Sequence, residues 1–141
     1  MPSRKIIRTN INEKYLDDEG ILRINVLEGA HITLEALKDD AANNFELTDN
    51  KKALAIYDSR AFFTIEPDAR EYVKSGIIDP TRLATAVLTN RLAVNILVNF
   101  FIRFNKPKTP MKLFTKEEDA LIWLRAIGKE LEAKEKEVQA L

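Results

Sequence analysis

The residues of this chain that could do chemistry lie next to segments that we expect to be buried strands. His31 comes just before the first predicted helix, and Asp58 and Ser59 directly follow the apolar run 53–57. The carboxyl ends of parallel strands meet at one edge of a sheet, and ligands bind there. A histidine, a carboxylate and a hydroxyl at this edge could serve as base, orienting group and nucleophile of a hydrolase.

A working triad also needs mutual hydrogen bonds and a pair of donors for the oxyanion. The Gly-x-Ser-x-Gly motif that presents a nucleophilic serine in many α/β hydrolases is absent from the sequence. We therefore interpret His31, Asp58 and Ser59 as polar loop residues that could contact a partner or ligand. We predict no catalytic residue and no enzymatic activity.

Three further residues at the same edge are candidates for binding a ligand or partner. Arg60 lies in the loop after residues 53–58, and Asn90 and Arg91 follow the apolar run 83–88. Either arginine could bind an anion at a helix N-terminus. The sequence lacks a glycine-rich phosphate loop, so arginines that are solvated or paired within the chain are the favoured interpretation.

The composition argues against metal and nucleic-acid sites. One histidine and no cysteine leave only carboxylates as metal ligands, so we predict neither a metal nor a cofactor. The best case for nucleic acid is a basic group that comprises Arg103, Lys106, Lys108, Lys112 and Lys116. The acids of residues 117–119 follow it directly, and we interpret the group as a solvated loop.

Length and charge indicate one soluble domain. The chain has 141 residues, enough to bury a core without disulfides, and its 22 basic and 22 acidic side chains cancel. No segment resembles a signal peptide or a membrane span, so the expected location is the cytoplasm.

Periodicity predicts strands that alternate with helices. Residues 6–16 and 21–26 form a hairpin around the turn 17–20, in which Gly20 supplies the positive φ. The remaining predicted elements are a helix at 33–47 capped by Thr33, a strand at 53–57, a helix at 67–74, a strand at 83–88, a helix at 91–104, a strand at 111–114 and a helix from 116. The fold class is thus α/β, with a mixed, mainly parallel sheet, an N-terminal antiparallel hairpin and the order β-β-α-β-α-β-α-β-α.

The third predicted helix is apolar on nearly every side. We expect one side of it to cover the sheet, namely Leu92, Ala93, Ile96, Leu97, Phe100, Phe101 and Phe104. Val94, Val98 and Ile102 then form a surplus apolar face, which soluble monomers seldom leave bare. Three alternatives stay open: the fourth helix or the tail covers this face, a second copy covers it in a homodimer, or an apolar ligand lies beneath the helix.

With this strand order, the chain resembles the STAS and SpoIIAA-like superfamily of bacterial anti-sigma-factor antagonists, and more closely a bacterial branch of small uncharacterised single-domain proteins. The resemblance covers about residues 4 to 127. The matching residues are 18–22, 29–35, 53–60, 67–70, 93–101, 105–107 and 113–115, with Glu118, Ala120, Trp123 and Leu124. We therefore expect a single STAS-like domain at residues 1–128. The charged residues 129–141, with i, i+4 pairs such as Glu130 with Lys134, are expected to form a helical tail.

One departure from the superfamily bears on regulation. Sigma-antagonist relatives carry a phosphorylated serine at the start of the second helix, whereas residues 65–69 here read Ile-Glu-Pro-Asp-Ala. Asp68 instead offers a permanent negative charge at a helix N-terminus, or simply helps to start that helix. The resemblance implies a non-catalytic module for protein interaction or regulation, with an unknown protein partner. The alternative is a small domain of the same fold that binds an apolar ligand or lipid.

Overall fold

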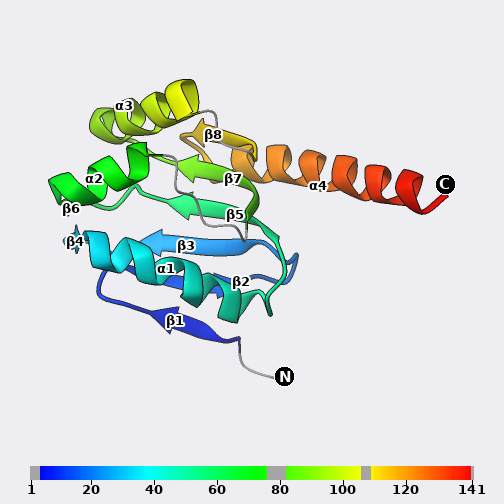
Figure 1. Cartoon of the computed structure of the whole chain (residues 1–141), viewed down its shortest axis with the longest axis horizontal. Coiled ribbons are helices and arrows are strands. Elements are labelled where there is room, and N and C mark those ends of the chain that lie inside the picture. The colour runs from blue at the N-terminus through cyan, green and yellow to red at the C-terminus, as the bar shows by residue number, and fades with distance from the viewer. Residues whose placement is uncertain (1–3, 76–81, 106–108, 141) are drawn as a thin grey trace.

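The computed structural model describes residues 4–75, 82–105 and 109–140, and it has the α/β architecture that the sequence predicts. Six strands form the main sheet, in the order β1-β2-β3-β5-β7-β8. Their bounds are β1 Ile6–Arg8, β2 Asn12–Leu16, β3 Leu22–Val26, β5 Ala53–Asp58, β7 Arg82–Leu88 and β8 Met111–Phe114. The strands from β3 to β8 pair in parallel, and β1 and β2 pair antiparallel (Figure 1).

Four α-helices and one π-helical turn accompany the sheet. Their bounds are α1 Leu34–Leu47, α2 Pro67–Lys74, α3 Leu92–Phe100, η1 Phe101–Asn105 and α4 Glu117–Ala140. The hydroxyl of Thr33 accepts a hydrogen bond from the backbone N–H of Ala36, which confirms the predicted cap of α1. Pro67 is the first residue of α2, where its missing N–H costs nothing.

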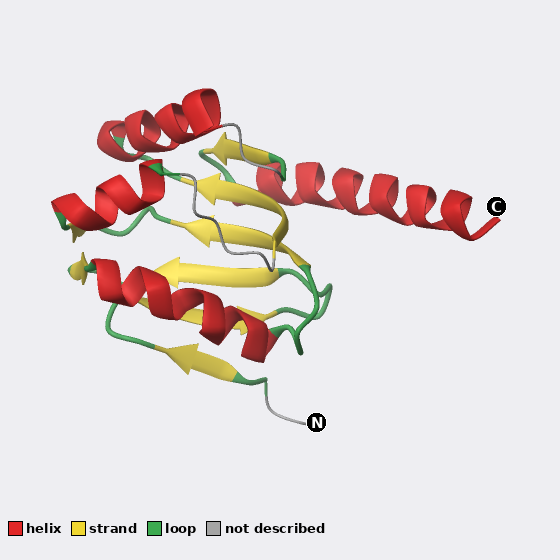
Figure 2. Cartoon of the chain, viewed as in Figure 1, coloured by secondary structure: helices red, strands yellow, loops and turns green. Residues whose placement is uncertain are grey.

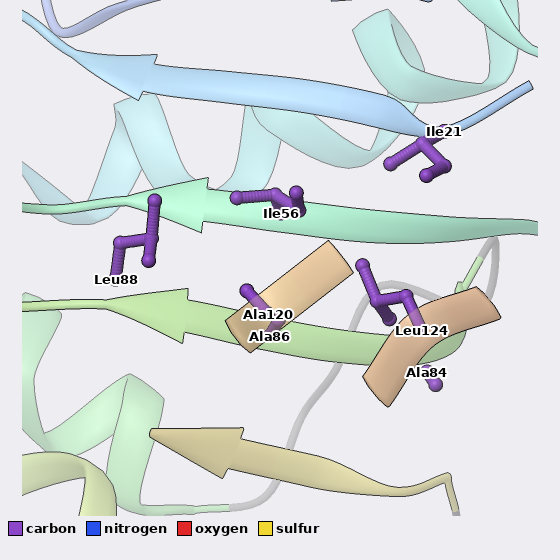
Figure 3. Packing of buried hydrophobic residues seen from close by; sticks show 7 residues of the cluster. All are labelled: Ile21, Ile56, Ala84, Ala86, Leu88, Ala120 and Leu124. Carbon is purple, nitrogen blue, oxygen red and sulfur yellow. The ribbon is translucent and has the colours of Figure 1, made fainter. Parts of the chain in front are cut away.

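The helices lie in two layers, one on each face of the sheet (Figure 2). On the α4 side, Ala120 and Leu124 pack with residues that alternate along the strands (Figure 3); these are Ile56 of β5 and Ala84, Ala86 and Leu88 of β7. On the opposite side, Ala55 of β5 packs with Leu47 of α1. The period-2 alternation of strand side chains thus divides the core between the two helix layers.

The N-terminal hairpin is more elaborate than the sequence predicts. Its first arm is divided into β1 and β2, because Thr9 makes a turn between them in which its hydroxyl accepts hydrogen bonds from the N–H groups of Ile11 and Asn12. The turn between β2 and β3 is the predicted one, with Gly20 at φ 80°.

Two short strands form where we expected loops. β4 (Ala30–Ile32) and β6 (Phe63–Ile65) pair in parallel as a separate two-stranded sheet. Gly29, at φ 79°, donates its N–H to the carbonyl of Phe62 and draws the two segments together. These two strands, and the division of the first hairpin arm into β1 and β2, add elements to the predicted order. The fold class stays α/β.

The third helix is rotated relative to our prediction. Val94 is 8% exposed and Phe101 is 4% exposed, so the side of the helix that carries these two residues faces the sheet. Leu92, Ile96 and Phe104 are 74%, 61% and 63% exposed. Our assignment of Leu92, Ile96, Phe100 and Phe104 to the sheet side is therefore wrong. Val94, Val98 and Ile102, which we predicted to form a surplus outer face, are buried or half-buried instead.

The C-terminal helix extends past the sheet as one continuous element. α4 continues to Ala140, so residue 128, where we predicted the domain to end, lies inside it (Figure 1). The side chains from Lys129 to Ala140 are exposed, apart from a half-buried Leu131. Predicted features at residues 76–81, 106–108 and 141, including Lys106, Pro107 and Lys108, lie outside the described residues.

Candidate functional site

His31, Asp58 and Ser59 are not hydrogen-bonded to one another, because each contacts other groups. Ser59 is buried, and its hydroxyl donates to the carbonyl of Leu88 at 2.7 Å, while its N–H donates to the same oxygen at 2.9 Å. These bonds join the ends of β5 and β7. Ser59 is therefore a structural residue at the carboxyl edge rather than an available nucleophile.

Asp58 is paired with Arg60 two residues later. The Arg60 guanidinium donates to both carboxylate oxygens, at 3.0 and 2.8 Å, and its backbone N–H donates at 3.1 Å. Burial acts to raise the pKa of Asp58, but these hydrogen bonds and the guanidinium charge outweigh it and lower the pKa. Asp58 thus remains ionised and holds Arg60, so neither residue orients His31.

His31 belongs to a small exposed cluster on the two-stranded sheet. Its Nδ1 lies 2.6 Å from the Thr64 hydroxyl, and its Nε2 lies 2.8 Å from a carboxylate oxygen of Glu66. The His31 and Glu66 side chains are about half exposed. The sequence missed this cluster because β4 and β6 have only three residues each, too few to show a period.

Arg91 is held at the start of α3 by backbone and aromatic contacts. Its guanidinium donates to the carbonyl of Phe63 at 3.1 Å and lies 5.1 and 4.8 Å from the ring centres of Phe62 and Phe63. Asn90, which precedes it, is exposed. Arg60 and Arg91 therefore both have partners within the chain.

Asp68 lies in the first turn of α2, where its carboxylate accepts the N–H of Ala69 at 2.8 Å. It also borders an open depression between the N-terminal ends of α1 and α2, together with Thr33, Glu35, Lys38 and Glu66. Helix N-termini favour such acids electrostatically. Asp68 therefore lies at the start of the second helix, as the sequence predicts.

A cavity of about 670 Å³ lies between the sheet and helices α1, α2 and α3. Its apolar lining includes Val94, Val98, Leu97 and Phe101 of the third helix and its π-helical turn. Two of the three predicted interface residues, Val94 and Val98, therefore face this cavity. Ile102 is half-buried.

A buried ion pair borders one end of the cavity. Lys14 of β2 is completely buried, and its ammonium lies 2.9 Å from Asp40 of α1, which also accepts two 3.3 Å hydrogen bonds from Asn12. Tyr57 is near the same carboxylate, and burial together with the Asp40 charge raises the pKa of its hydroxyl. The signal in the sequence was that Asp40 lies between two apolar positions of α1, Leu37 and Ala41.

The outer side of the third helix is an apolar ridge. We call Leu92, Ile96, Phe100 and Phe104 the outer ridge; they recur at every fourth residue, and the rings of Phe100 and Phe104 lie 4.7 Å apart. Clusters of large exposed apolar side chains mark interaction sites on soluble proteins. The outer ridge is therefore a better interface candidate than Val94, Val98 and Ile102.

The described part of the chain contains neither a group of metal ligands nor a helix that could span a membrane. Among residues 4–75, 82–105 and 109–140, no three His, Cys, Asp or Glu side chains are grouped as they would be around a metal ion. Over the same residues, no helix is long and apolar enough to cross a membrane.

Similarity to a solved structure shows the fold class of this protein. The chain is similar to an uncharacterised protein from Shewanella loihica PV-4, of the DUF3478 family, whose crystal structure has a SpoIIAA-like fold. The identity is 15%, the match covers 86% of this chain and 92% of that one, and the TM-score is 0.55. This likeness shows the fold and confirms the expected SpoIIAA-like class.

The particular family follows from the sequence. The family profile of the domain of unknown function DUF7793 matches residues 15–128, and the chain belongs to this family. The comparison with curated proteins gives no match.

Proposed function

We propose that this protein is a non-catalytic SpoIIAA-like module of the cytoplasm that binds a protein partner through the outer ridge of α3. The observation that carries the proposal is the exposure of Leu92, Ile96 and Phe104, at 74%, 61% and 63%, on one side of one helix. Removing these side chains from water favours association. A second copy of the chain is one partner that the ridge could bind.

The polar edge of the sheet supports a non-catalytic role. The Ser59 hydroxyl donates to a backbone carbonyl, Asp58 pairs with Arg60, and His31 contacts Thr64 and Glu66. A hydrolase would need the nucleophile and base within hydrogen-bond reach of each other. These residues instead hold strands and loops in place.

Photo-crosslinking in the native host tests the proposed interface. A photoreactive amino acid placed at Ile96 should form an adduct with a protein partner, whereas the same residue at Ile122 should not. Ile122 is a matched control, since it is 65% exposed and lies on α4, on the opposite face of the sheet. Equal adducts at both positions, or none at position 96, would contradict the proposal.

A second candidate function is the binding of an apolar ligand or lipid in the cavity under α3. The volume of this cavity, about 670 Å³, lies within the ~300–1,000 Å³ typical of ligand pockets. A fluorescent fatty acid is a suitable probe. Val98→Trp should fill the cavity and abolish binding, whereas Ile96→Trp, on the outer ridge, should leave binding unchanged.

A further inference from the structure

The outer ridge lies in a part of the chain with a strong excess of positive charge. From Pro80 to Lys116 the sequence contains seven Lys and Arg residues and no Asp or Glu, although the whole chain is neutral. The remaining residues therefore carry the compensating negative charge. Of the cations in this segment, Arg103 is exposed next to the ridge, and an exposed cation there attracts acidic partners.

Cations lie directly beside the rings of the ridge and at its beginning. The Lys74 ammonium lies 5.2 Å from the ring centre of Phe100, and the Arg103 guanidinium lies 5.8 Å from that of Phe104. Arg91 precedes Leu92 at the other end. Glu71, 3.6 Å from Lys74, offsets that charge, and the Arg91 guanidinium is held at the Phe63 carbonyl, so the exposed Arg103 carries most of the positive charge beside the ridge.

We propose that the outer ridge binds an acidic amphipathic helix of another protein, an inference that rests on the proposed function. The four side chains form a ridge at i, i+4 spacing, the kind that packs into the corresponding groove of a second helix. Asp and Glu on the flanks of the apolar stripe of that helix would meet Lys74 and Arg103. Such pairs at the rim set orientation and exclude wrong partners.

A second copy of this chain fits less well. If the outer ridges of two copies packed together, the cations beside one ridge would lie close to the same cations of the other copy. The projecting half of α4 carries Leu131 and Val138, but Lys134 and Glu135 both lie between them on the same side, so charges of both signs interrupt this stripe. Neither surface presents a continuous apolar stripe flanked mainly by acids.

An anionic bilayer also fits less well, because the exposed side of the helix is not uniformly apolar. Asn99 and Arg103 are exposed and lie three residues after Ile96 and Phe100, beside the ridge. A protein partner can supply hydrogen-bond acceptors to these groups. Lipid hydrocarbon has no hydrogen-bond acceptors, so burying Asn99 and Arg103 in it unpaired costs free energy.

Three fluorescein-labelled helical peptides of equal length test the inference on the full chain. The first has a leucine stripe flanked by glutamates, the second has the same stripe flanked by lysines, and the third has glutamates around an alanine stripe. By fluorescence anisotropy, we expect the first to bind about tenfold or more tightly than either other peptide. Ile96→Asp should weaken this binding by a similar factor, Ile122→Asp should not, and added salt should weaken it.

Other outcomes overturn the inference. These are equal binding of the lysine-flanked peptide, an equal effect of Ile122→Asp, or no binding of the first peptide. Cosedimentation with vesicles of phosphatidylcholine and phosphatidylglycerol that Ile96→Asp abolishes would assign the ridge to a bilayer. A dimer in light scattering that Ile96→Asp dissociates would assign it to a second copy. A crosslinked adduct at position 96 without binding of the first peptide would overturn this inference and leave the proposed function standing. If neither the adduct nor binding of the first peptide is found, both this inference and the proposed function are overturned.

Discussion

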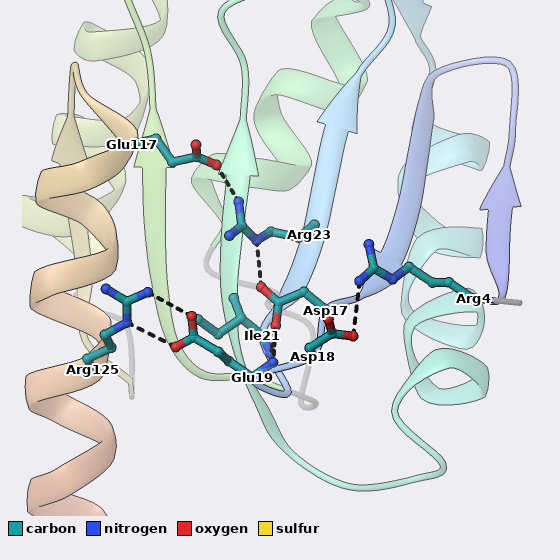
Figure 4. Close-up of polar contacts among 8 residues, drawn as sticks. All are labelled: Arg4, Asp17, Asp18, Glu19, Ile21, Arg23, Glu117 and Arg125. Carbon is teal, nitrogen blue, oxygen red and sulfur yellow. Dashed lines mark hydrogen bonds and ion pairs between the residues drawn. The ribbon is translucent and has the colours of Figure 1, made fainter. Parts of the chain in front are cut away.

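Arg125 of α4 and Glu19 of the β2–β3 turn form a two-point ion pair, although 106 positions separate them in the chain. The Nε and Nη2 atoms of Arg125 lie 2.9 and 2.7 Å from the two carboxylate oxygens. Arg23 makes a second connection nearby, since its guanidinium donates to both Asp17 and Glu117 (Figure 4). The turn between β2 and β3 is thus connected to the first turns of α4.

The two arginines should differ in their effect on stability. Arg23 and Asp17 are mostly buried, so Arg23→Ala should lower the free energy of unfolding by about 1–2 kcal/mol after allowance for partial screening by solvent. Arg125→Ala, at an exposed pair, should leave the denaturant midpoint nearly unchanged. Urea denaturation of both variants checks this, and an Arg125→Ala effect as large as that of Arg23→Ala would contradict it.

Asp58 should make stability depend on pH at the acid end. Its pKa is lowered in the folded protein, so its contribution is present above the unfolded value of ~3.9 and is lost as pH falls through the folded pKa. The unfolding free energies of the parent and of Asp58→Asn should therefore differ at pH 7 and converge toward pH 2. A constant difference over that range would show that Asp58 does not titrate in this way.

The buried ion pair should tolerate the loss of both charges better than the loss of one. Lys14→Met leaves the Asp40 carboxylate without its ammonium partner and should cost ~3–5 kcal/mol. Lys14→Met combined with Asp40→Leu should recover part of this cost, because no uncompensated charge remains. Chemical denaturation of the single and double variants measures the coupling, and additive losses would contradict it.

The superfamily's phosphorylation control should be absent. The start of α2 reads Glu66-Pro67-Asp68, without a hydroxyl at the position of the usual serine. Peptide mass spectrometry of protein from its native host should find no phosphate between Thr64 and Ser75. A phosphorylated residue in this interval would show that the departure from the superfamily has no regulatory meaning.

Much of the fold could be predicted because its signals are local. Thr33 caps α1, Pro67 begins α2, and the run that ends at Asp58 is a strand buried in the middle of the sheet. The short strands β4 and β6 could not be predicted, since they depend on the contact between Gly29 and Phe62 across more than thirty residues. Sequence periodicity does not report such tertiary hydrogen bonds.

The orientation of α3 could not be predicted for a different reason. A helix that is apolar on nearly all sides has no stripe to indicate which side is buried. We assigned its faces from spacing, and packing over the cavity places Val94 and Phe101 inside instead. The polar edge was predicted as a set of residues, but its pairing of Asp58 with Arg60 and of His31 with Glu66 required the three-dimensional structure.

The comparison of Val94→Asp with Ile96→Asp tests most directly whether α3 presents the outer ridge to its surroundings. Val94 is 8% exposed and Ile96 is 61% exposed, two residues apart on one helix. We expect Val94→Asp to lower the free energy of unfolding by at least about 3 kcal/mol, since it places a charge in the core, and Ile96→Asp to change it by no more than about 0.5 kcal/mol. Equal losses, or a larger loss for Ile96→Asp, would show that the helix faces the other way and that the proposed binding surface does not exist.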